Sequence, residues 1–180
     1  GSFTASPWAG VASAGSSGAK TLVDGGTGVA AGAAVNGFTP ANFDGVNDIL
    51  TNATALTSTA SAAAGTIILL VKVDTNPGGE RPVFTSTTAA GTTTDIYISY
   101  RPALSPFADN DGYTLNFGDG AAKLITSKKG SIGQWCFVAV RWNGVAASLK
   151  VNSGDPQYVA AGNLSGAGTM RIGGDSGGSF

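Results

Sequence analysis

Short runs of β-branched, aromatic and other apolar residues recur along most of the chain, separated by glycine, asparagine, aspartate, serine and proline. No stretch combines a 3.6-residue apolar period with capping residues and helix formers over three turns. The pattern therefore predicts β-structure from end to end. We expect strands at residues 39–44, 48–51, 66–73, 82–85, 95–101, 112–117, 121–126, 134–142, 145–152, 157–160 and 168–172.

Two of these runs predict how their strands are buried. Residues 66–73 are apolar on both faces, which favours a central strand of a sheet that is covered on each side. Residues 95–101 alternate instead, with isoleucine and tyrosine on one face. We expect their other face to be half exposed to water, and it carries Asp95, Tyr97, Ser99 and Arg101.

The clearest local prediction is a hairpin that joins residues 134–142 to residues 145–152. Asn143 and Gly144 are the pair that a two-residue type I′ turn prefers, because both central positions need a positive φ. Alternation places Trp135, Phe137, Ala139 and Arg141 on one side of the first strand and Cys136, Val138, Val140 and Trp142 on the other. Cys136 is the one cysteine of the chain, which excludes an internal disulfide, and we expect it to be a small buried core residue.

Residues 1–37 differ in composition from the rest. They are rich in glycine, alanine and serine, with few aromatic residues and little alternation. A free linker would fit this composition, but the recurrence of valine and leucine favours an arm that lies on the body of the domain. We therefore predict an N-terminal arm at 1–37 and one domain at 38–180.

Charge and hydropathy exclude several kinds of partner. The chain has 180 residues, of which 12% are charged, and its formal net charge is -1. Such a surface offers no electrostatic footprint for nucleic acid or anionic lipid. The longest apolar run, at 67–71, is far too short to span a bilayer. The first residues lack a basic segment followed by an apolar one, so a secretory signal is absent or already removed.

Three segments resemble the laminin-G-like jelly-roll family, in the order in which that family shows them. They are Ala-Asn-Phe-Asp-Gly-Val-Asn-Asp at 41–48, Trp-Cys-Phe-Val-Ala-Val-Arg-Trp-Asn-Gly at 135–144 with Leu-Lys-Val-Asn at 149–152, and Met-Arg-Ile-Gly-Gly-Asp at 170–175. The resemblance implies an all-β, two-sheet antiparallel jelly-roll sandwich of the concanavalin-A-like kind. Residues 7–10 and 36–40 also resemble the leader of laminin-G-like proteins from phages and prophages.

The chain departs from the family in one place. Members usually continue past the Arg-Ile-Gly-Gly strand with a strand of the pattern F-x-G-x-I-x-E, whereas this sequence ends at Phe180. The sequence leaves three explanations open: a truncated chain, an edge closed by the N-terminal arm, or an edge closed by a neighbouring subunit. An uncovered edge would be an association surface.

The residue types available for catalysis are few. Histidine is absent, which removes the commonest general base and any Ser-His or Cys-His pair. Glycosidases on this kind of fold need two carboxylates that flank the cleaved bond. Glu80 is the one glutamate of the chain, and no predicted strand presents two acids at alternate positions. We therefore predict that the protein is not an enzyme.

Two groups of aspartates could act as turns or as metal ligands. Asp109 and Asp111 precede a glycine, as in loops that offer several oxygens to Ca²⁺. The same residues favour an Asx turn, and no distal glutamate completes an EF-hand loop, so we predict a turn, no metal and no cofactor. We expect Asp44 and Asp48 to form a structural turn as well.

Sugar binding needs an aromatic platform for the C–H face of a ring and planar polar groups for its hydroxyls. Tyr97 and Arg101 are the first candidates, and Trp135 and Arg141 follow. Core packing is the competing explanation for Trp135 and Trp142, since large aromatic residues are mostly buried. The sequence does not decide on which side of their strands Tyr113 and Tyr158 lie.

Two functions are compatible with these features. One is a structural or decorating module of a virion or similar assembly, with possible contact to host glycans. The other is a secreted lectin-like module that binds carbohydrate. The phage-like leader, the low charge and the arm favour the first. We expect a homo-oligomer or a cell-surface glycan as partner, no nucleic acid, no membrane insertion, and a location at the virion surface or outside the cell.

Overall fold

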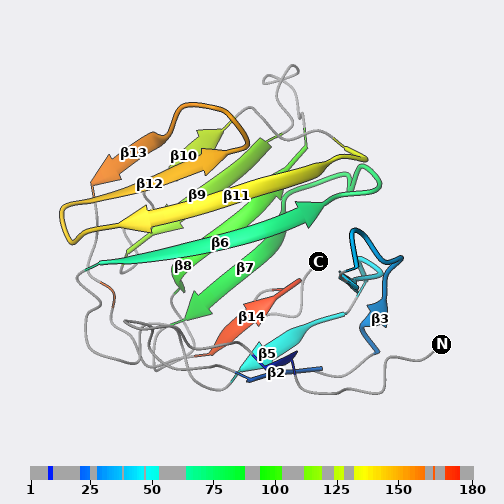
Figure 1. Ribbon diagram of the computed structural model, residues 1–180. Coiled ribbons are helices and arrows are strands. Elements are labelled where there is room, and N and C mark those ends of the chain that lie inside the picture. The colour runs from blue at the N-terminus through cyan, green and yellow to red at the C-terminus, as the bar shows by residue number, and fades with distance from the viewer. Residues whose placement is uncertain are drawn as a thin grey trace.

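The computed structural model is a sandwich of β-strands (Figure 1). The structure describes residues 8–9, 21–24, 28–37, 39–46, 48–52, 64–87, 94–102, 112–118, 124–127, 132–160, 164 and 169–174. The strands within these ranges are β1 Trp8–Ala9, β2 Thr21–Asp24, β3 Ala30–Ala31, β4 Ala41–Asn42, β5 Leu50–Asn52, β6 Gly65–Lys72, β7 Arg81–Thr87, β8 Thr94–Arg101, β9 Gly112–Phe117, β10 Leu124–Ser127, β11 Trp135–Trp142, β12 Ala146–Val151, β13 Gln157–Ala160 and β14 Met170–Ile172.

Two layers make up the sandwich. A large sheet has the strand order β1-β2-β5-β14-β7-β8-β9-β10, and a small sheet has the order β13-β12-β11-β6. The ribbon β3–β4 lies beside them (Figure 1). Every strand pair in the described part is antiparallel. The prediction of an all-β, two-sheet antiparallel sandwich is confirmed.

Each of the eleven predicted strands has a counterpart, although the one at 39–44 shrinks to the two residues of β4. Three short strands, β1, β2 and β3, lie within residues 1–37, where no strand was predicted. Pairing of β2 with β5 extends the large sheet. The division of the chain into an arm and a domain stays a prediction. No helix long and apolar enough to cross a membrane occurs among the described residues.

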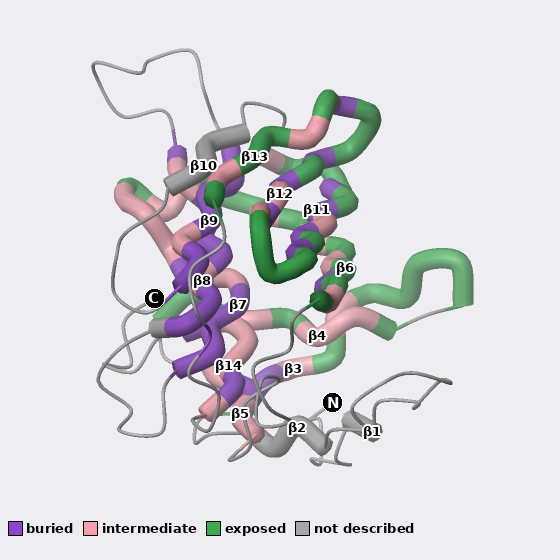
Figure 2. The backbone as a smooth tube through the Cα atoms, turned by 90° about the vertical axis from the view of Figure 1, so that its left-hand side faces the viewer, coloured by how far each residue is buried: buried purple, intermediate pink, exposed green. Residues whose placement is uncertain are grey.

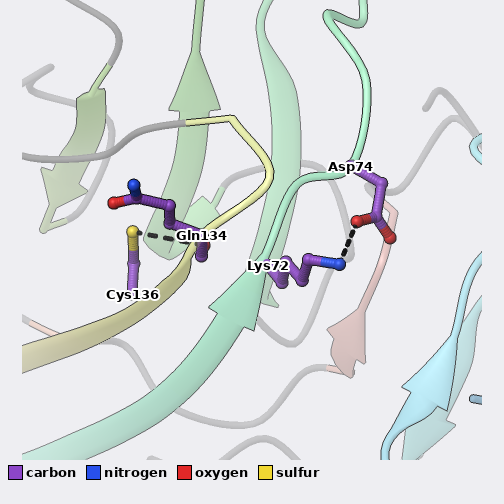
Figure 3. A network of polar contacts seen from close by, with 4 residues as sticks. All are labelled: Lys72, Asp74, Gln134 and Cys136. Carbon is purple, nitrogen blue, oxygen red and sulfur yellow. Dashed lines mark hydrogen bonds and ion pairs between the residues drawn. The ribbon is translucent and has the colours of Figure 1, made fainter. Parts of the chain in front are cut away.

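The core lies between the two sheets. Figure 2 shows buried segments on β7, β8 and β9 of one layer and alternating burial on β11 and β12 of the other. Fully buried side chains with no exposed surface include Ile96, Ile98, Leu115, Val138, Val140 and Leu149. The prediction that Cys136 is a buried core residue is confirmed, and its thiol donates to the carbonyl of Gln134 over 3.7 Å (Figure 3).

The two undecided tyrosines lie in opposite environments. Tyr113 is buried in the core, where its ring meets that of Tyr100 edge-on at a centroid distance of 5.5 Å, while Tyr158 is 71% exposed. Desolvation by burial raises the pKa of Tyr113, and the neighbouring Cys136 and Tyr100 raise it further. The phenol therefore stays protonated in the folded state at a pH where it ionises in the unfolded chain.

Alkaline pH should consequently destabilise the protein. Above about pH 10, the unfolded state binds fewer protons than the folded state, so the free energy of unfolding falls by up to about 1.4 kcal/mol per pH unit for this group. We expect Tyr113→Phe to remove this part of the pH dependence, measured as urea unfolding between pH 8 and 11.5. Tyr158→Phe is the control and should keep the wild-type slope. If the free energy of unfolding fell equally steeply with pH in both variants, Tyr113 would not be the group responsible for the alkaline destabilisation.

The prediction that residues 66–73 form a covered central strand is wrong. In the described part of the fold, β6 is the end strand of the small sheet, and its outward side chains Ile68 and Leu70 are 62% and 64% exposed. The inward side chains of this strand pack against the core, so only one side is covered. The polar end of the strand is held by an ion pair of 2.5 Å between Lys72 and Asp74 (Figure 3).

The β11–β12 hairpin is confirmed, but its predicted turn type is wrong. Gly144 has a φ of 81°, whereas Asn143 is not in the positive-φ region. The backbone N–H of Asn143 donates to Ala146 over 3.2 Å, so Gly144 and Val145 are the central residues, with glycine first as in a type II′ turn. The turn thus lies one residue later than predicted. The Asn143 side chain stabilises it there, because its oxygen accepts from the N–H groups of Val145 and Ala146.

Candidate functional site

The face of the large sheet that points away from the core carries a continuous line of polar side chains. Strand register places Arg171 of β14 between Thr51 of β5 and Thr85 of β7, and continues through Tyr97 of β8 to Asn116 of β9. Directly opposed side chains share a face and have Cβ atoms about 4.5–5.5 Å apart. We call these five residues the polar row.

A second set of polar groups lies beside the polar row. The Ser99 hydroxyl donates to Oε1 of Glu80 and also bonds the hydroxyl of Thr114, and Thr114 contacts the same carboxylate oxygen over 3.3 Å. Ser99 and Asp95 have no exposed surface, whereas Tyr97 and Arg101 are half-buried. The predicted half-exposed face is thus correct for Tyr97 and Arg101 and wrong for Asp95 and Ser99. For Ser99, the bonds to Glu80 and Thr114 satisfy the hydroxyl without water.

Arg171 is the most unusual member of the polar row. Its neighbours in β14, Met170 and Ile172, point to the core, so its own side chain points to the polar face. Nη1 of Arg171 is buried and has no hydrogen-bond partner within the described structure. Buried polar groups, and charged ones above all, normally have a partner. Arg171 as a whole is half-buried, so part of its side chain remains open to an anionic group from outside.

Sequence reasoning missed Arg171 as a site residue. The signal was present, because a charged residue between two apolar ones in a short strand must lie on the face opposite to the core. Its significance depends on register, which brings β14 between β5 and β7 although these strands are far apart in sequence.

The four predicted sugar-binding residues do not come together. Tyr97 and Arg101 lie on the polar face of the large sheet, where Arg101 is opposite Gly112. Trp135 and Arg141 lie on the outward side of β11, which is the other outer surface of the sandwich. Trp142 is buried in the core, as the packing alternative predicted, while Trp135 is 37% exposed.

The outward side of the small sheet carries exposed apolar side chains. Ile68 and Leu70 of β6 lie opposite Ala139 and Phe137 of β11, and Trp135 lies opposite Lys72. We call Ile68, Leu70, Trp135 and Phe137 the apolar patch, all of which are exposed. Lys150 of β12 and Arg141 are exposed on the same side.

The predicted turn at Asp44 and Asp48 is confirmed. Oδ2 of Asp48 accepts from the N–H of Asp44 over 2.9 Å, and Oδ1 of Asp44 accepts from the N–H of Val46 over 2.8 Å. The candidate calcium ligands Asp109 and Asp111 lie outside the described residues. Elsewhere, the described residues contain no group of three acidic, cysteine or histidine side chains that could hold a metal ion.

The two antiparallel sheets define the protein as a β-sandwich. No protein-family model and no curated protein sequence matches the chain. Among solved structures, the chain is similar to alginate lyase A1-II′, a member of polysaccharide lyase family 7, with 13% identity and a TM-score of 0.44. The similarity covers 94% of this chain and 74% of that chain.

The prediction that the protein is not an enzyme is withdrawn; the similar structure is that of an alginate lyase. The prediction rested on the absence of histidine and of paired acids on one strand. Those absences exclude particular catalytic templates, not catalysis as a class, since tyrosine, arginine and single acids can also carry proton transfer or stabilise charge.

Proposed function

We propose that the protein is a carbohydrate-binding jelly-roll domain whose polar row binds a polysaccharide that carries carboxylate groups. The observation that carries the proposal is the half-buried Arg171 on the polar face of the large sheet, whose Nη1 has no hydrogen-bond partner in the described structure. A guanidinium group binds carboxylate through two parallel N–H bonds, which gives both affinity and orientation.

The rest of the polar row supplies the other contacts that a sugar chain needs. Tyr97 offers a ring beside Thr85, two strands from Arg171, and Asn116 offers an amide one strand further. Adjacent strands are about 4.8 Å apart, so the row from β5 to β9 measures roughly 19 Å. That length suits an extended oligosaccharide that lies across the strands and contacts the half-buried members of the row, since Thr85 is only 1% exposed. The predicted roles in a virion, in a homo-oligomer and at a cell surface stay predictions.

Binding to a polyuronate should depend on Arg171. We expect the chain to bind polygalacturonate in isothermal titration calorimetry, and Arg171→Ala to weaken binding by about ten- to a hundredfold, the range for one charge-assisted hydrogen bond pair. Tyr97→Ala should weaken it as well. Arg141→Ala is the matched control, because this exposed arginine lies on the other outer surface, and it should bind like wild type.

A neutral polysaccharide separates carbohydrate binding as such from recognition of the carboxylate groups by Arg171. Wild type should bind uncharged galactan more weakly than polygalacturonate, and Arg171→Ala should abolish this preference. An equal loss of polygalacturonate binding in Arg141→Ala and Arg171→Ala would show that net charge, not the polar row, governs affinity. Absence of binding to any polysaccharide, with the fold intact by circular dichroism, would overturn the proposed function.

A further inference from the structure

Glu80, the one glutamate of the chain, brings a negative charge to the polar face of the large sheet. It lies directly before β7, and its Oε1 accepts from the hydroxyl of Ser99 and, over 3.3 Å, from that of Thr114. Both hydroxyl groups belong to residues with no exposed surface, and they also bond each other. Two buried hydroxyl groups therefore hold this carboxylate in one orientation.

The carboxylate of Glu80 has no ion-pair partner among the described residues. Arg101 lies two residues beyond Ser99 on the same face of β8, yet no ion pair joins it to Glu80. Arg81, the residue after Glu80, donates instead to the carbonyl of Pro77. Oε2 of Glu80 accepts no hydrogen bond from any residue that the structure describes, and Glu80 keeps exposed surface. One oxygen of an oriented carboxylate is therefore left for a ligand.

Strand register places this carboxylate next to the polar row. Ser99 and Thr114 are directly opposed, and they lie two residues along their strands from Tyr97 and Asn116. Positions two residues apart in a strand are separated by about 7 Å, and adjacent strands by about 4.8 Å. Arg171 lies two strands from Tyr97, so the backbone positions of Arg171 and Ser99 are about 12 Å apart. The polar face therefore carries a cation within the row and an anion beside its β8–β9 end.

These two charges favour different groups of a ligand. An ionised carboxylate is only an acceptor, so the free oxygen of Glu80 can bind sugar hydroxyl groups but not a second carboxylate. Hydrogen bonds to an ionised acceptor are roughly twice as strong as those between neutral groups. A ligand carboxylate in the same place would be repelled, and repulsion between like charges is a common source of specificity. Glu80 therefore disfavours a negative charge at its end of the row.

We propose that Glu80 is a specificity-determining residue of the polar row, which binds a polysaccharide whose free carboxylates are interspersed with uncharged sugars. This inference rests on the proposed function and narrows it to a substrate class. Arg171 binds the carboxylate of one sugar through its guanidinium group. Glu80 accepts from hydroxyl groups of an uncharged sugar further along the same chain. A polymer with a carboxylate on every sugar brings a like charge against Glu80 and binds more weakly.

Methyl esterification of polygalacturonate tests this selectivity, because it removes carboxylate charges and leaves the sugar backbone unchanged. The probes are the fully acidic, a partly esterified and the fully esterified polymer, compared by isothermal titration calorimetry at low salt, where charges are least screened. Wild type should bind the partly esterified polymer most tightly. Glu80→Gln keeps an oxygen that can accept from Ser99 and Thr114 but removes the charge. It should bind the fully acidic polymer best, with a gain of roughly three- to tenfold over wild type.

Asp155→Asn is the matched control, because it removes the same charge from an exposed residue between β12 and β13 and should keep the wild-type order of the three polymers. Glu80→Asp retains the charge and should keep that order too. If wild type bound the fully acidic polymer most tightly, or if Asp155→Asn changed the order as Glu80→Gln does, the role of Glu80 would be wrong while carbohydrate binding stood. If wild type bound none of the three polymers, the proposed function would be overturned, and this inference with it.

Discussion

Gly173→Ala is expected to destabilise the protein by about 3 kcal/mol or more, because two mechanisms of strain combine at this residue. Gly173 has a φ of 86°, a region that costs a residue with a Cβ about 1–2 kcal/mol. A Cβ at this position would also lie 2.4 Å from Cδ1 of Phe43 and 2.9 Å from the carbonyl oxygen of Asp48. The Phe43 ring could shift, but the backbone oxygen is fixed by the turn between Asp44 and Asp48.

Gly78→Ala is the matched control for this prediction. Gly78 has a φ of 70°, but a Cβ there would meet nothing within 4 Å. It should therefore lose about 1–2 kcal/mol from backbone strain alone. Urea unfolding of both variants measures the difference. If the two variants lost the same free energy of unfolding, the close approach of Phe43 and Asp48 to Gly173 would not add to the cost, and the prediction would be wrong.

This contact joins two of the segments that the sequence analysis singled out. The motif at 41–48 and the motif at 170–175 are far apart in sequence, yet Phe43 and Asp48 lie directly against Gly173. A glycine in the later motif is needed because residues of the earlier one occupy the space of its side chain. The order of such motifs therefore carries information on fold that no single strand pattern contains.

Alternation along the chain predicted the strands and most of the core, because burial on one face is a local property of a strand. The inward residues of β11, including Cys136, Val138 and Val140, are buried as alternation indicated. Position within a sheet is not local. The apolar residues on both faces of β6 predicted a central strand, whereas β6 lies at the edge of the described small sheet with Ile68 and Leu70 exposed.

The candidate site was predicted only in part for the same reason. Alternation placed Tyr97 and Arg101 on one face, and the structure agrees. It could not show that Trp135 and Arg141 lie on the opposite outer surface, because this depends on which sheet contains each strand. Arg171 joins Tyr97 through the register of β14, β7 and β8, and register between distant strands is not encoded in the pattern of either strand.

Gly65 and Trp142 should be energetically coupled across the small sheet. Gly65 begins β6 directly opposite Trp142 at the end of β11, and a Cβ on Gly65 would lie 2.1–2.7 Å from three atoms of the indole ring. Trp142 is only 5% exposed and its ring packs against Phe117 at a centroid distance of 5.5 Å, so the ring cannot move away freely. We expect Gly65→Ala alone to cost about 2 kcal/mol or more through overpacking.

The same change should cost little once the indole is gone. Trp142→Leu should destabilise the protein by about 2 kcal/mol through lost burial. In that background, Gly65→Ala places its methyl group in the vacated space and lowers the entropy of the unfolded chain, so its added cost should be near zero. A double-mutant cycle by urea unfolding should give a coupling energy of about 2 kcal/mol. Trp135→Leu on the outward side of β11 is the control background, and there Gly65→Ala should keep its full cost. If the costs of Gly65→Ala and Trp142→Leu were instead additive, the indole of Trp142 would not be the reason that position 65 requires glycine.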